Sequence, residues 1–279
     1  MTVERNAALA DAWARVAGKS GYIHLERRDP GILIVTLNRP SVLNALTYDM
    51  LDAFGLLWRT AGDDNWVRTV LVTGAGRAFC SGNDLRNKEP DHSMIRELMG
   101  DVLANARGMI GLDKPIVAAL NGAAVGFGLQ LAIMADVCIA AEDAVLIDGQ
   151  TRLAVTSGDQ SALLWPLLCG LARTKMHLFD LCGLTGKEAE EIGLVAKAVP
   201  RAQVMDHALA IADRLAAMSQ VALRGTKRSL NGWLWRSMPI FESAQSQTMV
   251  DLHHADVQEA RLALRELRSP DFPSDRKLP

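Results

Sequence analysis

The stretch Asn121-Gly122-Ala123-Ala124-Val125-Gly126-Phe127-Gly128-Leu129-Gln130 decides the fold. An apolar run from Pro115 to Leu120 precedes it and predicts a strand, while an Ala-rich run from Leu129 to Ala135 predicts a helix. A glycine-rich turn between a strand and a helix leaves backbone N–H groups free at the positive end of the helix dipole. Such groups can bind a phosphate or a developing oxyanion. The alternative is that Gly126 and Gly128 only allow close packing of the strand and the helix.

A second glycine-rich turn follows another predicted strand. The β-branched run Val70 to Thr73 is followed by residues 74–85, which read Gly-Ala-Gly-Arg-Ala-Phe-Cys-Ser-Gly-Asn-Asp-Leu. Ligand clefts of open α/β sheets lie at the carboxyl ends of strands. The two turns can therefore each donate one N–H group to the same oxygen.

Composition narrows the class of protein. The chain has 279 residues, of which 49% are hydrophobic and 22% charged, so it can bury the core of one large domain or of a core with an appendage. A net charge of −2 gives no reason to expect nucleic acid or an anionic membrane as a partner. The four cysteines contain no C-x-x-C pair and resemble buried apolar residues, which predicts a cytoplasmic protein. No apolar run is long enough to span a membrane, and no signal-peptide core precedes the first charged residues.

The rest of the pattern alternates strands and helices up to Pro200 and is helical after it. We expect a helical extension over 1–20, a β/α core over 21–200 and a helical C-terminal region over 201–279. The predicted helices cover 2–18, Thr47 (as the N-cap) to about Ala61, 92–112, 165–183 with a break near Gly170, 187–192, 201–218, 220–234 and 238–268. The predicted strands cover 22–28, 32–38, 68–73, 117–120, 137–140, 145–147 and 194–199, and the turn Asp29-Pro30-Gly31 predicts that the first two form a hairpin.

Five segments, in this order, resemble the crotonase (enoyl-CoA hydratase/isomerase) superfamily over roughly residues 20–272. They are Leu37-Asn38-Arg39-Pro40 with Asn44-Ala45-Leu46, then 71–85, 114–126 and 135–142, and finally Leu184-Thr185-Gly186 with Ala189-Glu190 and Gly193-Leu194-Val195. The resemblance implies a twisted β/α spiral core with a helical oligomerisation region, and a homotrimer or a dimer of trimers. It also implies an acyl-CoA thioester substrate, with coenzyme A entering as part of that substrate and no permanently bound cofactor.

The resemblance also implies a site for the thioester. Its oxygen would be bound by the backbone N–H groups of Asn83 and Phe127, and two such donors stabilise an enolate-like intermediate. The family has glycine at the position of Phe127, where a non-glycine residue still offers its N–H. Contacts to the CoA ester are expected from Val42, Leu43, Ala45, Ser81, Gly82, Asp84, Leu85, Gly126 and Lys227.

The chain departs from the family where hydratases carry two glutamates. The corresponding residues are Gln130 and Gln150, which can orient a water molecule but cannot accept a proton as a general base. The nearby carboxylates are Asp159 and Asp148, and burial at a thioester pocket would raise the pKa of either. We predict Asp159, and secondarily Asp148, as acid/base groups. The alternatives are that Asp159 caps the following helix and that Asp148-Gly149 forms a plain turn.

Other classes of site and function have less support in the sequence. The chain has no P-loop and no G-x-S-x-G motif, and the adjacent His253 and His254 make a poor metal site. Asp148-Gly149, Gly158-Asp159 and Trp165-Pro166 are similar to the β-diketone hydrolases of the superfamily, which cleave a C–C bond without CoA, although their histidines are not evident. A catalytically silent subunit that binds CoA esters is the non-enzyme alternative. We predict a hydratase/isomerase-like enzyme, a lyase or isomerase of fatty acid metabolism.

Overall fold

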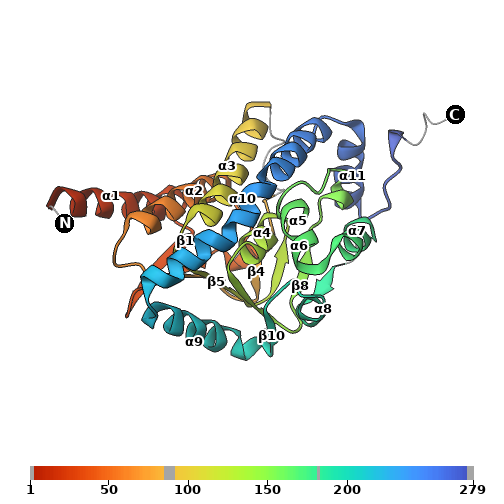
Figure 1. The fold of residues 1–279 in the computed structure, drawn as a ribbon. Helices are drawn as coiled ribbons and strands as arrows, with labels where there is room; N and C mark the ends of the chain where they lie inside the picture. Colours follow the sequence, from red (N-terminus) through yellow and green to blue (C-terminus); the bar gives the residue numbers. More distant parts are fainter. Residues whose placement is uncertain (1–2, 85–91, 181–182, 275–279) are drawn as a thin grey trace.

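The computed structural model describes residues 3–84, 92–180 and 183–274, which form a mixed α/β fold with two sheets and a helical C-terminal part (Figure 1). The larger sheet has the strand order β1-β2-β3-β5-β7-β10. Its strands are β1 (Ile23–Arg28), β2 (Ile32–Leu37), β3 (Thr69–Gly74), β5 (Ile116–Leu120), β7 (Val137–Ala141) and β10 (Lys197–Val199). The predicted hairpin is confirmed, because β1 pairs antiparallel to β2, whereas every later pairing in this sheet is parallel. All residues of β3 and β5 are buried, as expected for parallel strands covered on both faces.

The smaller sheet has the strand order β4-β6-β8-β9 and was not predicted from the sequence. Its strands are β4 (Ala78–Cys80), β6 (Ala123–Val125), β8 (Val145–Ile147) and β9 (Leu184–Thr185). Two of them, β4 and β6, lie inside the glycine-rich segments that were read only as turns. The parallel pairing of β4 with β6 therefore joins those two segments directly.

Helices surround both sheets (Figure 1). They are α1 (Val3–Ser20), α2 (Tyr48–Asp63), α3 (His92–Gly111), α4 (Phe127–Ile133), α5 (Gln160–Leu163), α6 (Trp165–Cys169), α7 (Leu171–Asp180), α8 (Gly186–Glu191), α9 (Val204–Ala217), α10 (Gln220–Asp251) and α11 (Ala255–Glu266). The predicted cap of α2 is confirmed, since the Thr47 side chain accepts a hydrogen bond from the N–H of Met50. The break between α6 and α7 is at Gly170, as predicted, where φ is +80°. Within the described ranges, no helix is both long and apolar enough to cross a membrane.

The N-terminal helix α1 packs along α2. Val16 is fully buried, and the indole N–H of Trp13 donates to a carboxylate oxygen of Asp64 at 2.8 Å. The predicted extension is thus a helix that is fixed to the core by one apolar and one polar contact.

The C-terminal helices differ from the prediction. The sequence predicted a break after residue 234, ahead of Pro239, but α10 runs unbroken from Gln220 to Asp251 with Pro239 inside it. Proline inside a helix costs about 3 kcal/mol, and tertiary contacts on both sides offset this cost. Before the proline, the Asn231 amide donates to the carbonyl of Ile110, and after it Phe241 is fully buried. The real break follows Asp251, where α11 begins under a cap from His254.

Candidate active site

The two glycine-rich segments meet at Gly82 and Val125. A Cβ atom on Gly82 would lie 2.9 Å from the carbonyl oxygen of Val125, so the backbones touch there. Gly82 and Gly126 both have positive φ, of +85° and +52°, which favours glycine at each turn. Asn83 and Phe127 come directly after these glycines, and the contact therefore brings their backbone N–H groups to the same place.

Neither of these N–H groups donates to a backbone carbonyl of the described residues. Phe127 is the first residue of α4, so its N–H has no acceptor within the helix. Leu46 pairs across Asn83: its N–H donates to Gly82, and its carbonyl accepts from Asp84. This pairing turns the N–H of Asn83 away from Leu46. Among the described residues, no backbone carbonyl accepts a hydrogen bond from either group.

The segment before α2 fixes the first turn in place. Asn44 is fully buried, and its amide donates to the carbonyls of Ala75, Ala78 and Phe79. The N–H of Ser81 donates to the carbonyl of Leu43 at 3.0 Å. The predicted CoA contacts in 42–45 and 81–84 therefore lie side by side. The Asp84 carboxylate is paired with Arg39 at 3.2 Å, and Leu85 lies outside the described residues.

The second turn is fixed by close packing. A Cβ atom on Gly128 would lie 2.5 Å from the carbonyl oxygen of Cys80, so α4 approaches β4 as closely as a glycine allows. The Phe127 ring is buried and lies 6.4 Å from the ring of Phe54 on α2. Its side chain is thus part of the core, while its N–H lies at the start of the helix.

Two buried aspartates lie beyond this turn. Asp148 follows β8, Asp159 precedes α5, and their side chains are 6% and 3% exposed. One oxygen of Asp148 accepts a hydrogen bond from the Ser157 hydroxyl at 2.6 Å. One oxygen of Asp159 accepts from the Gln150 amide at 3.3 Å. The other oxygen of each carboxylate forms no hydrogen bond of ordinary length among the described residues, although the Ser161 side chain lies close enough to Asp148 to lower its pKa.

Burial and mutual repulsion change the protonation of this pair. Desolvation, and then the negative charge of Asp148, raise the pKa of Asp159 to about 8. Desolvation also raises the pKa of Asp148, and hydrogen bonds from its neighbours oppose that rise. Because the two groups interact, they release protons as a pair. Near neutral pH the pair can hold a proton and exchange it with a substrate, which is what a general acid/base requires.

The alternative role of Asp159 as a helix cap is not supported. Asp159 occupies the N-cap position of α5, but its side chain makes no capping hydrogen bond. The N–H groups of Gln160 and Ser161 lie close enough to lower the pKa of Asp159 slightly, without offsetting its burial. A helix cap is defined by a hydrogen bond from the side chain to the first turn, and Asp159 makes none.

The two glutamines at the glutamate positions differ in their surroundings. Gln150 is bound within the protein: its amide nitrogen donates to Asp159, and its amide oxygen accepts from the N–H of Gly158 at 2.8 Å. Gln130 is fully buried on α4, and neither its amide nitrogen nor its amide oxygen has a partner among the described residues. Gln150 therefore contacts Asp159 directly, whereas the Gln130 amide makes no such contact among the described residues.

Helix α10 holds the loop that carries Asp159. The Asp251 carboxylate accepts hydrogen bonds from the N–H and the hydroxyl of Thr156, at 2.8 and 2.5 Å. The Gln245 amide donates to the carbonyl of Gly158 at 3.1 Å. A Cβ atom on Gly158 would lie 2.6 Å from the carbonyl oxygen of Ala244, so the loop packs closely on α10. Sequence reasoning missed these residues, because nothing in their spacing relates α10 to a loop almost 90 residues earlier.

We expect Asp251→Ala to loosen this loop and to lower turnover about tenfold, since positioning of an acid/base group contributes strongly to its effect. The pH dependence of turnover should change as well, because the environment of Asp159 sets its pKa. Steady-state rates measured across pH test this. Ser246→Ala, an exposed change on the same helix, is the control and should leave both unchanged. An unchanged pH profile in Asp251→Ala would remove the positioning role.

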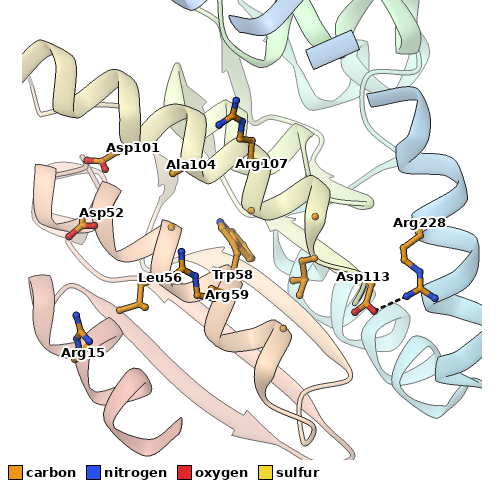
Figure 2. A pocket seen from close by; sticks show the side chains of 15 residues that line it. Arg15, Asp52, Leu56, Trp58, Arg59, Asp101, Ala104, Arg107, Asp113 and Arg228 are labelled. Carbon is orange, nitrogen blue, oxygen red and sulfur yellow. Dashed lines mark ion pairs between the residues drawn. The ribbon is translucent and has the colours of Figure 1, made fainter. Parts of the chain in front are cut away.

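A separate hollow of the described surface lies away from these two turns. A groove of about 890 Å³ runs between α2 and α3 and is lined by charged residues, among them Arg15, Arg59 and Arg107 (Figure 2). At one end, Arg228 forms an ion pair with Asp113 at 3.7 Å. Neither buried aspartate nor either free N–H group belongs to its lining. The groups suited to thioester chemistry therefore lie at the two turns and not in this groove.

Comparison with known proteins shows the family to which the chain belongs. A sequence model of the family described as enoyl-CoA hydratase/isomerase matches residues 27–275. The chain belongs to the enoyl-CoA hydratase/isomerase family. It is 33% identical over 278 residues to a protein of Mycobacterium bovis named "Probable enoyl-CoA hydratase echA12", covering 93% of this chain and 96% of the relative.

Solved structures of this family have the same fold. An enoyl-CoA hydratase/isomerase from Mycobacterium paratuberculosis matches with a TM-score of 0.81 and 30% identity, over 86% of this chain and 96% of that one. A monofunctional enoyl-CoA isomerase from M. smegmatis matches with a TM-score of 0.66 and 32% identity, over 76% and 93%. The predicted superfamily and fold class are thus confirmed, and the family acts on CoA esters.

Lys227, predicted from the family resemblance to contact CoA, is engaged inside the protein. Its ammonium donates to the carbonyl of Lys114 and forms an ion pair with Asp136 at 2.7 Å, and its side chain is only 7% exposed. Burial lowers the pKa of Lys227, and the Asp136 carboxylate opposes that effect. A phosphate could bind this ammonium only by breaking the pair, so Lys227 has no part in the function proposed below.

Proposed function

We propose that this enzyme moves a proton next to the carbonyl of an acyl-CoA thioester. The thioester oxygen would accept hydrogen bonds from the N–H groups of Asn83 and Phe127. Ionised Asp159 would take a proton from the carbon beside the thioester, which leaves an enolate and a neutral Asp159 carboxylic acid. Return of that proton to another carbon of the acyl chain gives an isomer. In hydration, the hydroxyl of a water molecule would instead add to the third carbon of a 2-enoyl thioester, the carboxylate pair would take the other proton of that water, and the resulting enolate would be protonated at the second carbon.

The observation that carries this proposal is the buried, interacting pair Asp148 and Asp159. The pair would supply the proton transfer that two glutamates supply in hydratases of this family and that Gln130 and Gln150 cannot supply. Its presence argues against a catalytically silent subunit. Each N–H donor of an oxyanion site is worth about 3 kcal/mol of transition-state stabilisation. Deprotonation beside a thioester needs such donors together with a base, and this site offers both.

We also propose that the enzyme is a homotrimer, or a dimer of trimers, assembled through its C-terminal helices. The supporting observation is a set of large apolar side chains that are exposed on α7 and α10. They are Leu171, Met176, Phe179, Val221, Leu230, Trp233, Trp235, Ile240 and Val250. Exposed apolar surface of this kind marks an interaction site. Analytical ultracentrifugation of the purified protein should give a mass of three or six chains, and a monomer would remove the proposal.

Deuterium exchange tests the proposed reaction. The protein is incubated in heavy water with saturated and unsaturated acyl-CoA thioesters, and the products are weighed by mass spectrometry. We expect deuterium at the carbon beside the thioester, or an isomerised or hydrated product. The matched control is the corresponding free acid, whose carboxylate does not form such an enolate readily. Absence of exchange with every thioester by folded protein would contradict the proposal.

A CoA-independent β-diketone hydrolase is the second candidate. One observation favours it: a small hollow of about 10 Å³ beside Asp148 is also lined by His177 of α7, which places a histidine near the carboxylate pair. Cleavage of a cyclic 1,3-diketone in the absence of CoA, followed by mass spectrometry, distinguishes it from thioester chemistry.

A further inference from the structure

The chain leading into β4 and the chain leading into β6 are joined by one arginine from a distant part of the sequence. Arg201 is the first residue of the 3₁₀ helix η3 (Arg201–Gln203), which follows β10 at the edge of the larger sheet. Its Nη1 atom donates to the carbonyl oxygen of Arg77 at 2.9 Å and to that of Asn121 at 2.6 Å. Arg77 directly precedes β4, and Asn121 lies two residues before β6. A single nitrogen therefore binds the starts of both strands.

The guanidinium of Arg201 is itself held in place. Its Nε and Nη2 atoms lie 3.3 and 3.0 Å from one carboxylate oxygen of Asp143, in the turn between β7 and β8. A Cβ atom on Gly122 would overlap the carbonyl oxygen of Arg77 and would lie 2.7 Å from Nη1 of Arg201. The backbone is therefore shaped to admit the guanidinium, and Asp143 orients it toward the two carbonyls.

The pairing of β4 with β6 leaves the starts of both strands to be held by other contacts. Its register shifts between Ala78 and Cys80, and an irregularity of this kind interrupts the hydrogen-bond ladder. The Asn121 amide holds the chain further back, where it donates to the carbonyls of Gly74 and Gly76. The two carbonyls that meet on the guanidinium repel each other, and its positive charge offsets that repulsion. Loss of the guanidinium should therefore let the starts of β4 and β6 move apart.

The same two strands lead to the N–H groups of the candidate site. Asn83 comes six residues after Arg77, and Phe127 comes six residues after Asn121. Because β4 and β6 are short and run parallel, a change in their separation at one end reaches the turns at the other end. Misplacement of a reacting group by about 1 Å can cost about 10²-fold in rate, even when the altered residue lies far from the chemistry.

We propose that Arg201 is a positioning residue, which sets the spacing of the Asn83 and Phe127 N–H groups through β4 and β6 without touching the substrate. The proposal rests on the proposed function, because it assumes that both N–H groups bind the thioester oxygen. The Arg201 side chain is 41% exposed, so water can hydrate the two carbonyls when the guanidinium is removed. Its loss should therefore change the geometry of the site more than the stability of the fold.

Arg201→Met tests this role, because it keeps an unbranched side chain and removes every donor. We expect the maximal rate of deuterium exchange beside the thioester to fall about tenfold, with the half-saturating thioester concentration within about twofold of the wild type. The melting temperature should be almost unchanged. Infrared difference spectra of a bound acyl-CoA, isotopically labelled at the thioester carbonyl, give a second readout, since hydrogen bonds to that oxygen lower its stretching frequency. Arg201→Met should lower the frequency less than the wild type does.

Two controls accompany this variant. Asp143→Asn keeps an acceptor for the guanidinium, and Arg214→Met makes the same replacement at an exposed position of α9. Both should keep the wild-type rate and frequency. If Arg201→Met did not fold, Arg201→Gln would carry the test, because its amide is too short to reach both carbonyls.

The outcomes separate this proposal from the proposed function. A wild-type rate and frequency in a folded Arg201 variant would overturn the positioning role and leave the proposed function intact. A rate that fell only in proportion to the loss of folded protein, with the wild-type frequency in the folded fraction, would also overturn it. If the wild-type enzyme bound thioesters without lowering the carbonyl frequency, the proposed function itself would fail.

Discussion

Asp159→Asn is expected to lower the rate of deuterium exchange beside the thioester by about 10²- to 10⁴-fold, the usual contribution of a general acid/base. Asparagine keeps the size of the side chain and can still contact the Gln150 side chain, but it cannot accept a proton. The N–H donors of Asn83 and Phe127 are untouched, so thioester binding should change little. A large loss of rate with nearly constant affinity would identify Asp159 as a group that acts in the chemical step.

The pH dependence follows from the direction of the pKa shift. Burial raises the pKa of Asp159 to about 8 from its ordinary 3.8. A base must be ionised, so the wild-type exchange rate should rise with pH and level off above about pH 8. Asp159→Asn should lose this rise. A rate that falls as pH increases would instead indicate that protonated Asp159 acts as the acid.

The raised pKa of Asp159 should also make the stability of the fold depend on pH. Between about pH 4 and pH 8, folded Asp159 keeps a proton that the unfolded chain releases. The free energy of unfolding therefore falls as pH rises through this range, because the folded state binds more protons there. Asp159→Asn should lack most of this fall and should be more stable than the wild type at pH 8. Denaturant unfolding at several pH values measures the difference.

The matched control is Asp206→Asn, which changes an exposed aspartate in the first turn of α9. It should leave exchange, its pH profile and stability near the wild-type values. If Asp159→Asn kept full activity, Asp148 would be the next group to change, because its free oxygen belongs to the same pair. Full activity in both single variants would contradict acid/base catalysis by the pair.

Sequence reasoning located the two turns because their chemistry is local. Glycine at 82, 126 and 128 indicated turns with close backbone approach, and the structure has positive φ at Gly82 and Gly126 and close approach at Gly82 and Gly128. The hairpin at Pro30 and the Thr47 cap were predictable for the same reason, since each depends on residues within a few positions. The order of the strands, by contrast, is not encoded in any such short stretch.

Features that depend on distant residues were missed or left open. Of the smaller sheet, only β8 was predicted as a strand. The other strands, β4, β6 and β9, are two or three residues long, too short for periodicity to reveal. The predicted gap between residues 234 and 238 is absent from α10, because a sequence pattern alone does not include the tertiary contacts that hold the helix. The choice between cap and acid/base group for Asp159 required the position of Asp148, eleven residues earlier in the chain.

Gly128→Ala is expected to disrupt the oxyanion site through a single added methyl group. The new Cβ would lie 2.5 Å from the carbonyl oxygen of Cys80, 2.6 Å from its Cβ and 2.8 Å from its Sγ. The Cys80 backbone is fixed by the β4–β6 pairing, so α4 must move away from β4. Overpacking of this kind costs about 1–3 kcal/mol of stability.

The displacement of α4 in Gly128→Ala should lower the catalytic rate by a larger factor than its effect on the stability of the fold suggests. Phe127 is next to Gly128 and Asn83 is three residues after Cys80, so separation of β4 and α4 separates the two N–H donors. Loss of one such donor lowers kcat about 10²- to 10³-fold. Affinity for free CoA should be almost unchanged. The segments predicted to contact CoA, 42–45 and 81–84, are held together by hydrogen bonds that do not involve α4.

Gly100→Ala provides the matched control for this change. Gly100 lies within α3, and a Cβ atom there would have no neighbour within 4 Å, so the same methyl group meets open space. Alanine is favoured over glycine in a helix by about 1 kcal/mol, which predicts slightly higher stability and unchanged exchange. If Gly128→Ala folded and still catalysed exchange at the wild-type rate, the N–H of Phe127 would not be part of the site. Loss of activity in Gly128→Ala alone ties the close approach of α4 to β4 to stabilisation of the enolate.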